Sequence, residues 1–258
     1  MEEDEAMIDH ISAVMIVKNG AESLRVCLQA LATFKEVIVY ENGSTDDTPL
    51  IAQSFPNVTL IQGVFLGFGK TKNKAATYAS NDWIFSLDAD EVLSDEMALC
   101  LEKLHLSPST LYSIERSNYY HDQKIKHCGW NSETIIRLYN KTQTAFNDNM
   151  VHEKIMTKTC AIEKIAGELK HYPYASISHF IQKIDHYSTL FASEHVGKRS
   201  SSPTKAFFNA LYSFVRTYFF RAGFLDGYAG LLIAFSHMSA NFYKYMKLYE
   251  ANQKIKRP

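Results

Sequence analysis

The chain has 258 residues, of which 46% are apolar and 21% are charged, and its net charge is −1. These values exclude a disordered or fibrous protein and predict one large domain, or a domain and a half, with a sizeable buried core. The longest apolar run near the C-terminus, Tyr228 to Phe235, is far short of the roughly 20 residues that a membrane-spanning helix needs.

The first ten residues are acidic, and no basic residue precedes Lys18. A secretory signal peptide begins with positive charge, so we expect a cytoplasmic protein. The four cysteines lie far apart and have no partner at metal-ligand spacing, which predicts free, buried thiols instead of a zinc site or a disulfide framework.

Charge is distributed unevenly along the chain. Residues 198–258 hold ten Lys or Arg against two acids, or +8, and the remainder holds 17 against 26, or −9. A basic tail on an acidic body predicts that the tail meets an anionic surface. Nucleic acid is excluded as the partner because the body is acidic and contains no recognised binding motif.

Strand and helix patterns alternate through the first 90 residues, as in a parallel sheet with crossover helices. Short apolar runs predict strands at 11–17, 37–40, 58–61 and 83–87. Helices are predicted at 21–32, after Thr48 as N-cap with Pro49 at the first helical position, and at 70–80. Two more strands, at 111–119 and 134–139, extend the predicted sheet, and from about Ile177 the composition becomes helical and aromatic.

Polar residues follow each predicted parallel strand. They are Lys18 and Asn19, the turn 41–44, the loop 67–69, and Asp88 with Asp90. The carboxyl ends of the strands form the ligand-binding edge of an open α/β sheet, so these residues are predicted to converge.

Asp88 and Asp90 directly follow a buried apolar strand. Alternation along a strand places residues i and i+2 on the same side, which predicts two carboxylates side by side. Such hard oxygen ligands suit Mg²⁺ or Mn²⁺ shared with substrate phosphates. An Asp-x-Asp also occurs in solvated turns, but its place after a buried strand favours the metal.

The turn from Glu41 to Thr48 has two interpretations. Asn, Gly, Ser and Asp are ordinary turn residues, and a strand-to-helix turn with exposed amides is also a nucleotide-binding device. Lys70, Lys72 and Lys74 begin a helix at the same edge, where cations would face a pyrophosphate; at least one of them is expected to lie on a solvated helix face.

Four motifs in order, SAVMIVKN, VYENGSTDDT, GFGKTKNKA and NDWIFSLDADE, resemble the inverting glycosyltransferases of family 2, and most of all the branch that adds glucose or a related sugar to the inner core of bacterial lipopolysaccharide. The resemblance continues more loosely through 129–141, 150–155 and 227–235. It implies an α/β domain of GT-A fold with a helical C-terminal extension. The implied division is an acidic tail at 1–10, a catalytic domain at 11–176 with a nucleotide-binding half at 11–100 and an acceptor-side half at 101–176, and a basic, aromatic segment at 177–258.

The resemblance also implies roles for single residues. Asp88 would lie near the ribose or uracil of a UDP-sugar donor, and Asp90 would bind Mn²⁺ or Mg²⁺. Glu41 stands where the family usually has the Asp that contacts the base, and Asn42 replaces a Ser or Asp. The implied nucleotide-sugar-binding set also contains Lys18, Asn19, Ser44, Asp46, Lys72 and Asn73.

Inverting transfer needs a carboxylate that takes the proton of the acceptor hydroxyl. The Glu-Asp pair of many relatives is absent from the expected region, which leaves Glu153 and Asp148 as candidates. Glu153 is favoured because its Val-His-Glu run matches the pattern of this branch, with His152 as a metal ligand or an orienting partner.

The tail supports two readings. A helix that is apolar around most of its circumference is usually core, whereas aromatics interleaved with Lys and Arg are typical of an interfacial helix. We expect the second, with the tail peripherally bound to the anionic inner face of the cytoplasmic membrane.

The predicted function is transfer of a hexose, such as glucose, from a UDP-sugar to a lipopolysaccharide or lipooligosaccharide core acceptor. Alternatives are transfer to a polyprenyl-linked or other surface glycan, and a catalytically silent binding module for envelope assembly. A nucleotidyltransferase is disfavoured because the first strand is not followed by a basic, Gly-rich loop.

Overall fold

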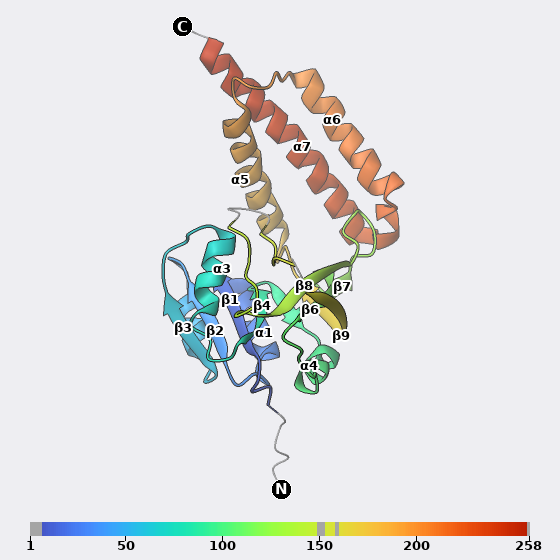
Figure 1. Cartoon of the computed structure of the whole chain (residues 1–258). Helices are drawn as coiled ribbons and strands as arrows, with labels where there is room; N and C mark the ends of the chain where they lie inside the picture. Colours follow the sequence, from blue (N-terminus) through green and yellow to red (C-terminus); the bar gives the residue numbers. More distant parts are fainter. Residues whose placement is uncertain (1–6, 149–152, 158–159, 257–258) are drawn as a thin grey trace. The chain divides into compact units, whose positions relative to one another are not determined.

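The computed structural model describes residues 7–148, 153–157 and 160–256 and divides the chain into two compact units (Figure 1). The first unit contains residues up to 117 and residues 132–172; the second contains residues 118–131 and everything from 173 onward. Residues 118–131, which the sequence placed in the acceptor-side half, therefore lie with the C-terminal helices.

The first unit is built on four parallel strands in the order β3 (Val58–Gln62), β2 (Val37–Glu41), β1 (Ser12–Val17) and β4 (Trp83–Asp88). The register pairs Val17 with Glu41 and Ile16 with Asp88, so these strands end together. The predicted convergence of their carboxyl ends is confirmed.

Both faces of β1, β2 and β4 are buried, which explains their continuous apolar runs, whereas the edge strand β3 is partly exposed. Ala13, Met15 and Val17 of β1 face one core with α1 (Ala21–Ala30). Val14 faces a second core with α3 (Phe68–Ala76). Helix α2 (Thr48–Gln53) begins at Thr48 itself. The prediction of Thr48 as the N-cap residue is therefore wrong: Asp47 is the N-cap residue, and its side chain makes no capping hydrogen bond.

An antiparallel extension continues the sheet beyond β4. Within the described residues the strand order runs on through β8 (Glu133–Asn140), β6 (Thr110–Tyr120), β9 (Ala161–His171) and β5 (Glu91–Leu93). Helix α4 (Asp95–Glu102) starts where Ser94 accepts the N–H of Met97. Gly167 of β9 has φ +94°, and a Cβ there would lie 2.6 Å from the Met97 backbone nitrogen, so a glycine lets β9 and α4 approach closely.

In the second unit the described strands are the end of β6 and the short strand β7 (Gln123–Lys124), which pairs with it; its other regular elements are helical. Its helices are α5 (Ile177–His195), α6 (Pro203–Val215) and α7 (Gly227–Lys256), with a π-helical turn η1 (Arg216–Phe220) and a 3₁₀ turn η2 (Gly223–Asp226) between α6 and α7. Ser176 and Ser202 cap α5 and α6 by accepting backbone N–H groups. None of the described helices is long and apolar enough to span a bilayer.

Asp226 of η2 links the two segments of this unit, residues 118–131 and the segment that begins at residue 173. The buried Asp226 carboxylate accepts the backbone N–H of Lys126 at 3.2 Å and of His127 at 2.9 Å, and it contacts His127 Nδ1. The four cysteines are free thiols, as predicted; Cys27 and Cys128 are buried, and Cys100 and Cys160 are partly exposed.

Candidate active site

Two cations hold the carboxylate at the end of β4. Asp88 Oδ1 lies 2.8 Å from Lys72 Nζ, and Oδ2 lies 2.7 Å from an Arg137 nitrogen. Burial alone would raise the pKa of Asp88, but the positive charges of Arg137 and Lys72 outweigh it and hold that pKa well below its ordinary value. Asp88 is therefore a fixed anion.

A second carboxylate, that of Glu91, contacts Arg137 as well. Glu91 is fully buried, accepts hydrogen bonds from Arg137 and from Arg116 at 2.9 Å, and also accepts the backbone N–H of Asp88 at 3.0 Å. A buried ion must be paired and hydrogen-bonded to be tolerated, and each member of this network is. Glu91, Arg116 and Arg137 were missed by the sequence analysis, although a lone Arg inside the apolar run Ile135 to Leu138 was a signal for a buried ion pair.

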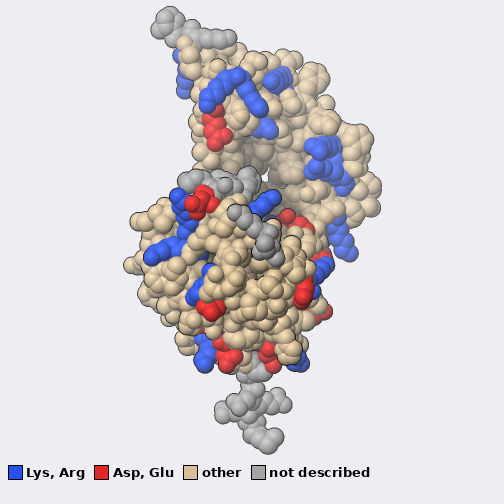
Figure 2. Space-filling model, viewed as in Figure 1, with Lys and Arg blue, Asp and Glu red and all other residues tan. Residues whose placement is uncertain are grey.

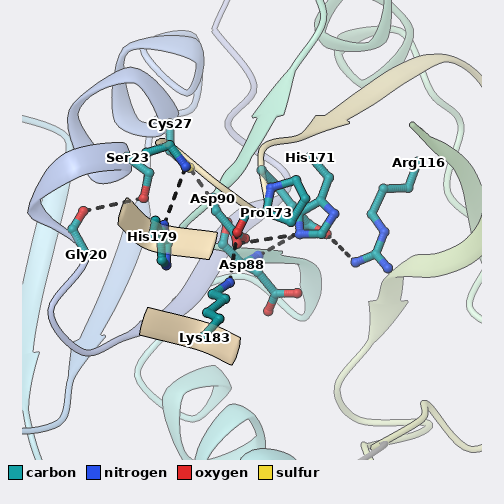
Figure 3. A network of polar contacts seen from close by, with 12 residues as sticks. Gly20, Ser23, Cys27, Asp88, Asp90, Arg116, His171, Pro173, His179 and Lys183 are labelled. Atoms are coloured by element: carbon teal, nitrogen blue, oxygen red, sulfur yellow. Dashed lines mark hydrogen bonds and ion pairs between the residues drawn. The ribbon is translucent and has the colours of Figure 1, made fainter. Parts of the chain in front are cut away.

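Asp90 points to a different partner. The residue lies in the turn between β4 and β5, not in the strand, so the alternation that predicted two parallel carboxylates does not apply. Its Oδ2 lies 3.5 Å from His171 Nε2, because β5 pairs with β9 in the register Glu91 to His171. Figure 3 shows Asp88, Asp90, Arg116 and His171 close to one another.

The segment after β8 brings Glu153 to the same site. Glu153 Oε1 lies 2.8 Å from Lys72 Nζ, and its side chain is only 15% exposed. Asn73 fixes this segment by exchanging two hydrogen bonds of 2.9 Å with the backbone of Phe146. One ammonium group, that of Lys72, therefore joins Asp88 to Glu153.

Asp148, the other candidate base, lies differently. Its side chain is 75% exposed, and its contact is a 4.0 Å ion pair with Lys70. His152, the predicted metal ligand, lies outside the described residues.

The predicted nucleotide turn is tightly hydrogen-bonded. Glu41 is buried and accepts the N–H of Ser44. Asn19, at φ +53°, accepts the N–H of Thr45 at 2.8 Å and donates its own N–H to Ser44 Oγ at 2.9 Å. The loop after β1 and the turn after β2 are thus joined into one rim of the edge, where Lys18 is exposed.

Asp46 has a structural task in this rim. It accepts the N–H and hydroxyl of Thr48 and the N–H of Ala21, the first residue of α1. Burial opposes ionisation, but these hydrogen bonds lower the pKa of Asp46 below its ordinary value. These contacts of Asp46 agree with the interpretation of 41–48 as an ordinary turn. Asn42 donates its backbone N–H to the carbonyl oxygen of Val17.

A divalent cation can be tested against these side chains. Among the residues that the structure describes, no three His, Cys, Asp or Glu side chains cluster as a complete metal site. The carboxylate oxygen of Asp90 suits Mn²⁺ or Mg²⁺, His171 offers a nitrogen beside it, and the other positions of such an ion would be left for substrate oxygens and water. The residues therefore fit an ion that is shared with a substrate.

Comparison with known proteins decides the family. The sequence model described as "Glycosyl transferase family 2" matches residues 12–166, which is more than half of the chain. The chain belongs to glycosyl transferase family 2. Together with the parallel sheet and its antiparallel extension, this membership confirms the predicted GT-A fold with a helical C-terminal extension.

Two relatives and one solved structure are among the proteins that this chain is similar to. An uncharacterized glycosyltransferase of Rickettsia conorii is 30% identical over 98% of this chain and 94% of its own length. The lipopolysaccharide core biosynthesis glycosyltransferase LpsC of Rhizobium meliloti is 25% identical over 96% of this chain and 95% of its own. Among solved structures, TarS residues 1–349 of S. aureus in complex with UDP aligns over 96% of this chain and 91% of that one, with 14% identity and a TM-score of 0.45.

Proposed function

We propose that this glycosyltransferase moves a hexose, such as glucose, from a UDP-sugar to a lipopolysaccharide or lipooligosaccharide core acceptor with inversion at the anomeric carbon. The observation that carries the proposal is the contact of Lys72 with both Asp88 and Glu153. Asp88, at the end of β4, and Glu153, in the segment after β8, therefore contact the same ammonium group.

Glu153 is proposed as the general base. It takes the proton of the acceptor hydroxyl while that oxygen forms its bond to the anomeric carbon, and the bond from that carbon to the diphosphate breaks. Lys72 holds the Glu153 carboxylate in place. Asp148 is the weaker candidate because solvent surrounds it.

Asp90 is proposed as a ligand of Mn²⁺ or Mg²⁺, with His171 beside it as the second protein ligand. A bound divalent cation supplies charge neutralisation for the departing diphosphate. His152 keeps its proposed role as a ligand or orienting residue. Asp88 and the rim of Lys18, Asn19, Glu41, Asn42 and Ser44, with Asp46 and Asn73 supporting it, are proposed to hold the nucleotide.

The acceptor class is supported by LpsC, whose name places that relative in lipopolysaccharide core biosynthesis. A polyprenyl-linked or other surface glycan is the alternative acceptor. The silent binding module is disfavoured because the carboxylates of Asp88, Asp90 and Glu153 are all present, and Lys72 contacts two of them. We further propose that the enzyme works at the inner face of the cytoplasmic membrane, bound peripherally through residues 177–258.

The deciding experiment uses the full chain with Mn²⁺, a panel of UDP-sugars, and a lipopolysaccharide core acceptor truncated before the added sugar. Thermal shift identifies the donor, because a ligand at 100 times its Kd stabilises the folded state by about 2.7 kcal/mol. UDP release and mass spectrometry of the product then measure transfer. Stabilisation by a UDP-sugar without any transfer to core or polyprenyl-linked acceptors would favour the silent module.

A further inference from the structure

Part of the second unit exposes many large apolar side chains. Between residues 207 and 235 the exposed fractions run from 38% to 77%. The residues are Phe207, Phe208, Leu211, Tyr212, Phe219, Phe220, Phe224, Leu225, Tyr228, Leu231 and Phe235. A soluble monomer rarely exposes so many together, and such a surface marks an interaction site.

These residues lie in helical stripes. On α6 the spacing 207, 208, 211, 212 follows one helix face, and on α7 the spacing 228, 231, 235 does the same. A cavity of about 220 Å³, lined by Phe207 and Leu211 of α6 and by Met238, Phe242 and Tyr243 of α7, joins the two helices on this side. Figure 1 shows α6 and α7 side by side, and in the chain η1 and η2 connect them. We call the eleven exposed residues the apolar face.

The charges on the same segment are of one sign. Lys205, Arg216 and Arg221 are exposed. The one acid between residues 203 and 235 is Asp226, which is buried and accepts hydrogen bonds from the backbone N–H groups of Lys126 and His127. Figure 2 shows Lys and Arg scattered over a largely uncharged surface on these helices. A basic margin around apolar side chains complements an anionic lipid surface.

A second copy of the chain is a poorer occupant. In a symmetric dimer the same patch meets itself, so Arg216 and Arg221 would face the same positive charges with no exposed acid in the segment to pair with them. Phospholipid head groups supply those negative charges.

We propose that the apolar face of α6, η1, η2 and the start of α7 inserts into the boundary between head groups and acyl chains of an anionic bilayer. The inference rests on the proposed function for its membrane-borne acceptor and its peripheral attachment, and it assigns that attachment to the insertion of apolar side chains. Two lysines in the second half of α7 are otherwise engaged: Lys247 pairs with Asp185 at 2.7 Å, and Lys244 lies over the rings of Phe191 and Tyr245.

The test compares two double variants of the full chain by flotation with vesicles of phosphatidylethanolamine containing a minority of phosphatidylglycerol. Phe220→Gln with Leu225→Gln removes two side chains of the face that are 77% and 62% exposed. Ile181→Gln with Tyr187→Gln removes two that are each 62% exposed on α5, outside the face, and is the matched control. Thermal unfolding checks that both variants are folded.

We expect the Phe220/Leu225 variant to bind vesicles at least about tenfold more weakly, since each change removes apolar surface from the bilayer, and the control to bind like the wild type. Wild-type binding should survive 1 M salt in part, because salt screens the arginines and not the apolar contact. Phe220→Trp should shift its fluorescence to the blue on vesicle binding, and Tyr187→Trp should not.

Equal binding by the two double variants would overturn the proposal, as would wild-type binding that salt abolishes completely. Absence of vesicle binding together with a dimer that Phe220→Gln and Leu225→Gln dissociate would assign the face to self-association instead. Vesicle binding is measured without donor or acceptor, so its failure is separate from any failure of glycosyl transfer.

Discussion

Lys72 Nζ lies 2.8 Å from Glu153 Oε1, although the two residues belong to segments far apart in the chain. The same nitrogen lies 2.8 Å from Asp88 Oδ1, and the Lys72 side chain is only 4% exposed. A buried cation between two carboxylates makes each of them depend on it.

Glu153→Gln keeps the size of the side chain and removes its ability to take a proton. We expect kcat to fall about 10²- to 10⁴-fold, with UDP-sugar binding nearly unchanged. Asp148→Asn is the matched control and should retain near wild-type activity because its carboxylate is exposed. The assignment is wrong if steady-state kinetics show the reverse order.

Lys72→Met removes the shared cation. We expect a loss of activity at least as large as for Glu153→Gln, and a double variant scarcely worse than either single one, because the two residues act together. Lys70→Met, on an exposed side chain, is the control. Fully multiplicative losses would show that the contact has no functional consequence.

Asp90→Asn and His171→Ala should each weaken UDP binding in the presence of Mn²⁺ while leaving the much weaker metal-free binding unchanged. Isothermal titration with Mn²⁺ and with a chelator measures both. Asp47→Asn changes an exposed acid of the neighbouring turn and should alter neither. If Asp90→Asn retains the full effect of Mn²⁺ on UDP affinity, the metal is held elsewhere.

Glu91→Gln leaves Arg116 and Arg137 facing an uncharged group in a buried position. Breaking a buried ion pair from one side costs about 3–5 kcal/mol of unfolding free energy. Glu133 also pairs with Arg116, but its side chain is 49% exposed. Glu133→Gln should therefore lower the unfolding free energy by no more than about 1 kcal/mol. Urea unfolding followed through Trp83 of β4 in a Trp130→Phe background measures both, and similar costs would refute the buried network.

His237 makes the stability of the second unit depend on pH. Burial, and then the charge of Arg221, lower the pKa of His237 to about 4, and its Nδ1 contacts the Thr217 hydroxyl at 3.1 Å. The unfolded chain gains a proton near pH 6.5 and the folded one does so only near pH 4, so stability should fall as pH decreases through this window.

Helix unfolding monitored by circular dichroism at pH 7 and pH 4.5 tests this. His237→Gln should lose less stability between the two values than the wild type, and His186→Gln, at an exposed position, should behave like the wild type. An unchanged pH dependence in His237→Gln would place the titrating group elsewhere.

The sequence by itself determined the four parallel strands, the edge where they end, and two of the antiparallel strands, but it did not predict β5, β7 or β9. Runs such as 12–17 and 83–88 are apolar because both of their faces are buried, and the turns after them carry the residues that turns require. These are local properties, so a single sequence displays them. Boundaries moved slightly, as at α3, which begins at Phe68 and not at Lys70.

The tertiary structure alone decided which side chains meet at that edge. Pairing of β4 with β8 and β8 with β6 brings Arg137 and Arg116 over Glu91, and pairing of β5 with β9 brings His171 to Asp90. It also gave Asp90 a different partner from Asp88, because β4 ends at Asp88, two residues before Asp90. These contacts depend on strand pairing and on the packing of segments that are far apart in the sequence. Local residue patterns predict neither, because they reflect only the environment of neighbouring residues.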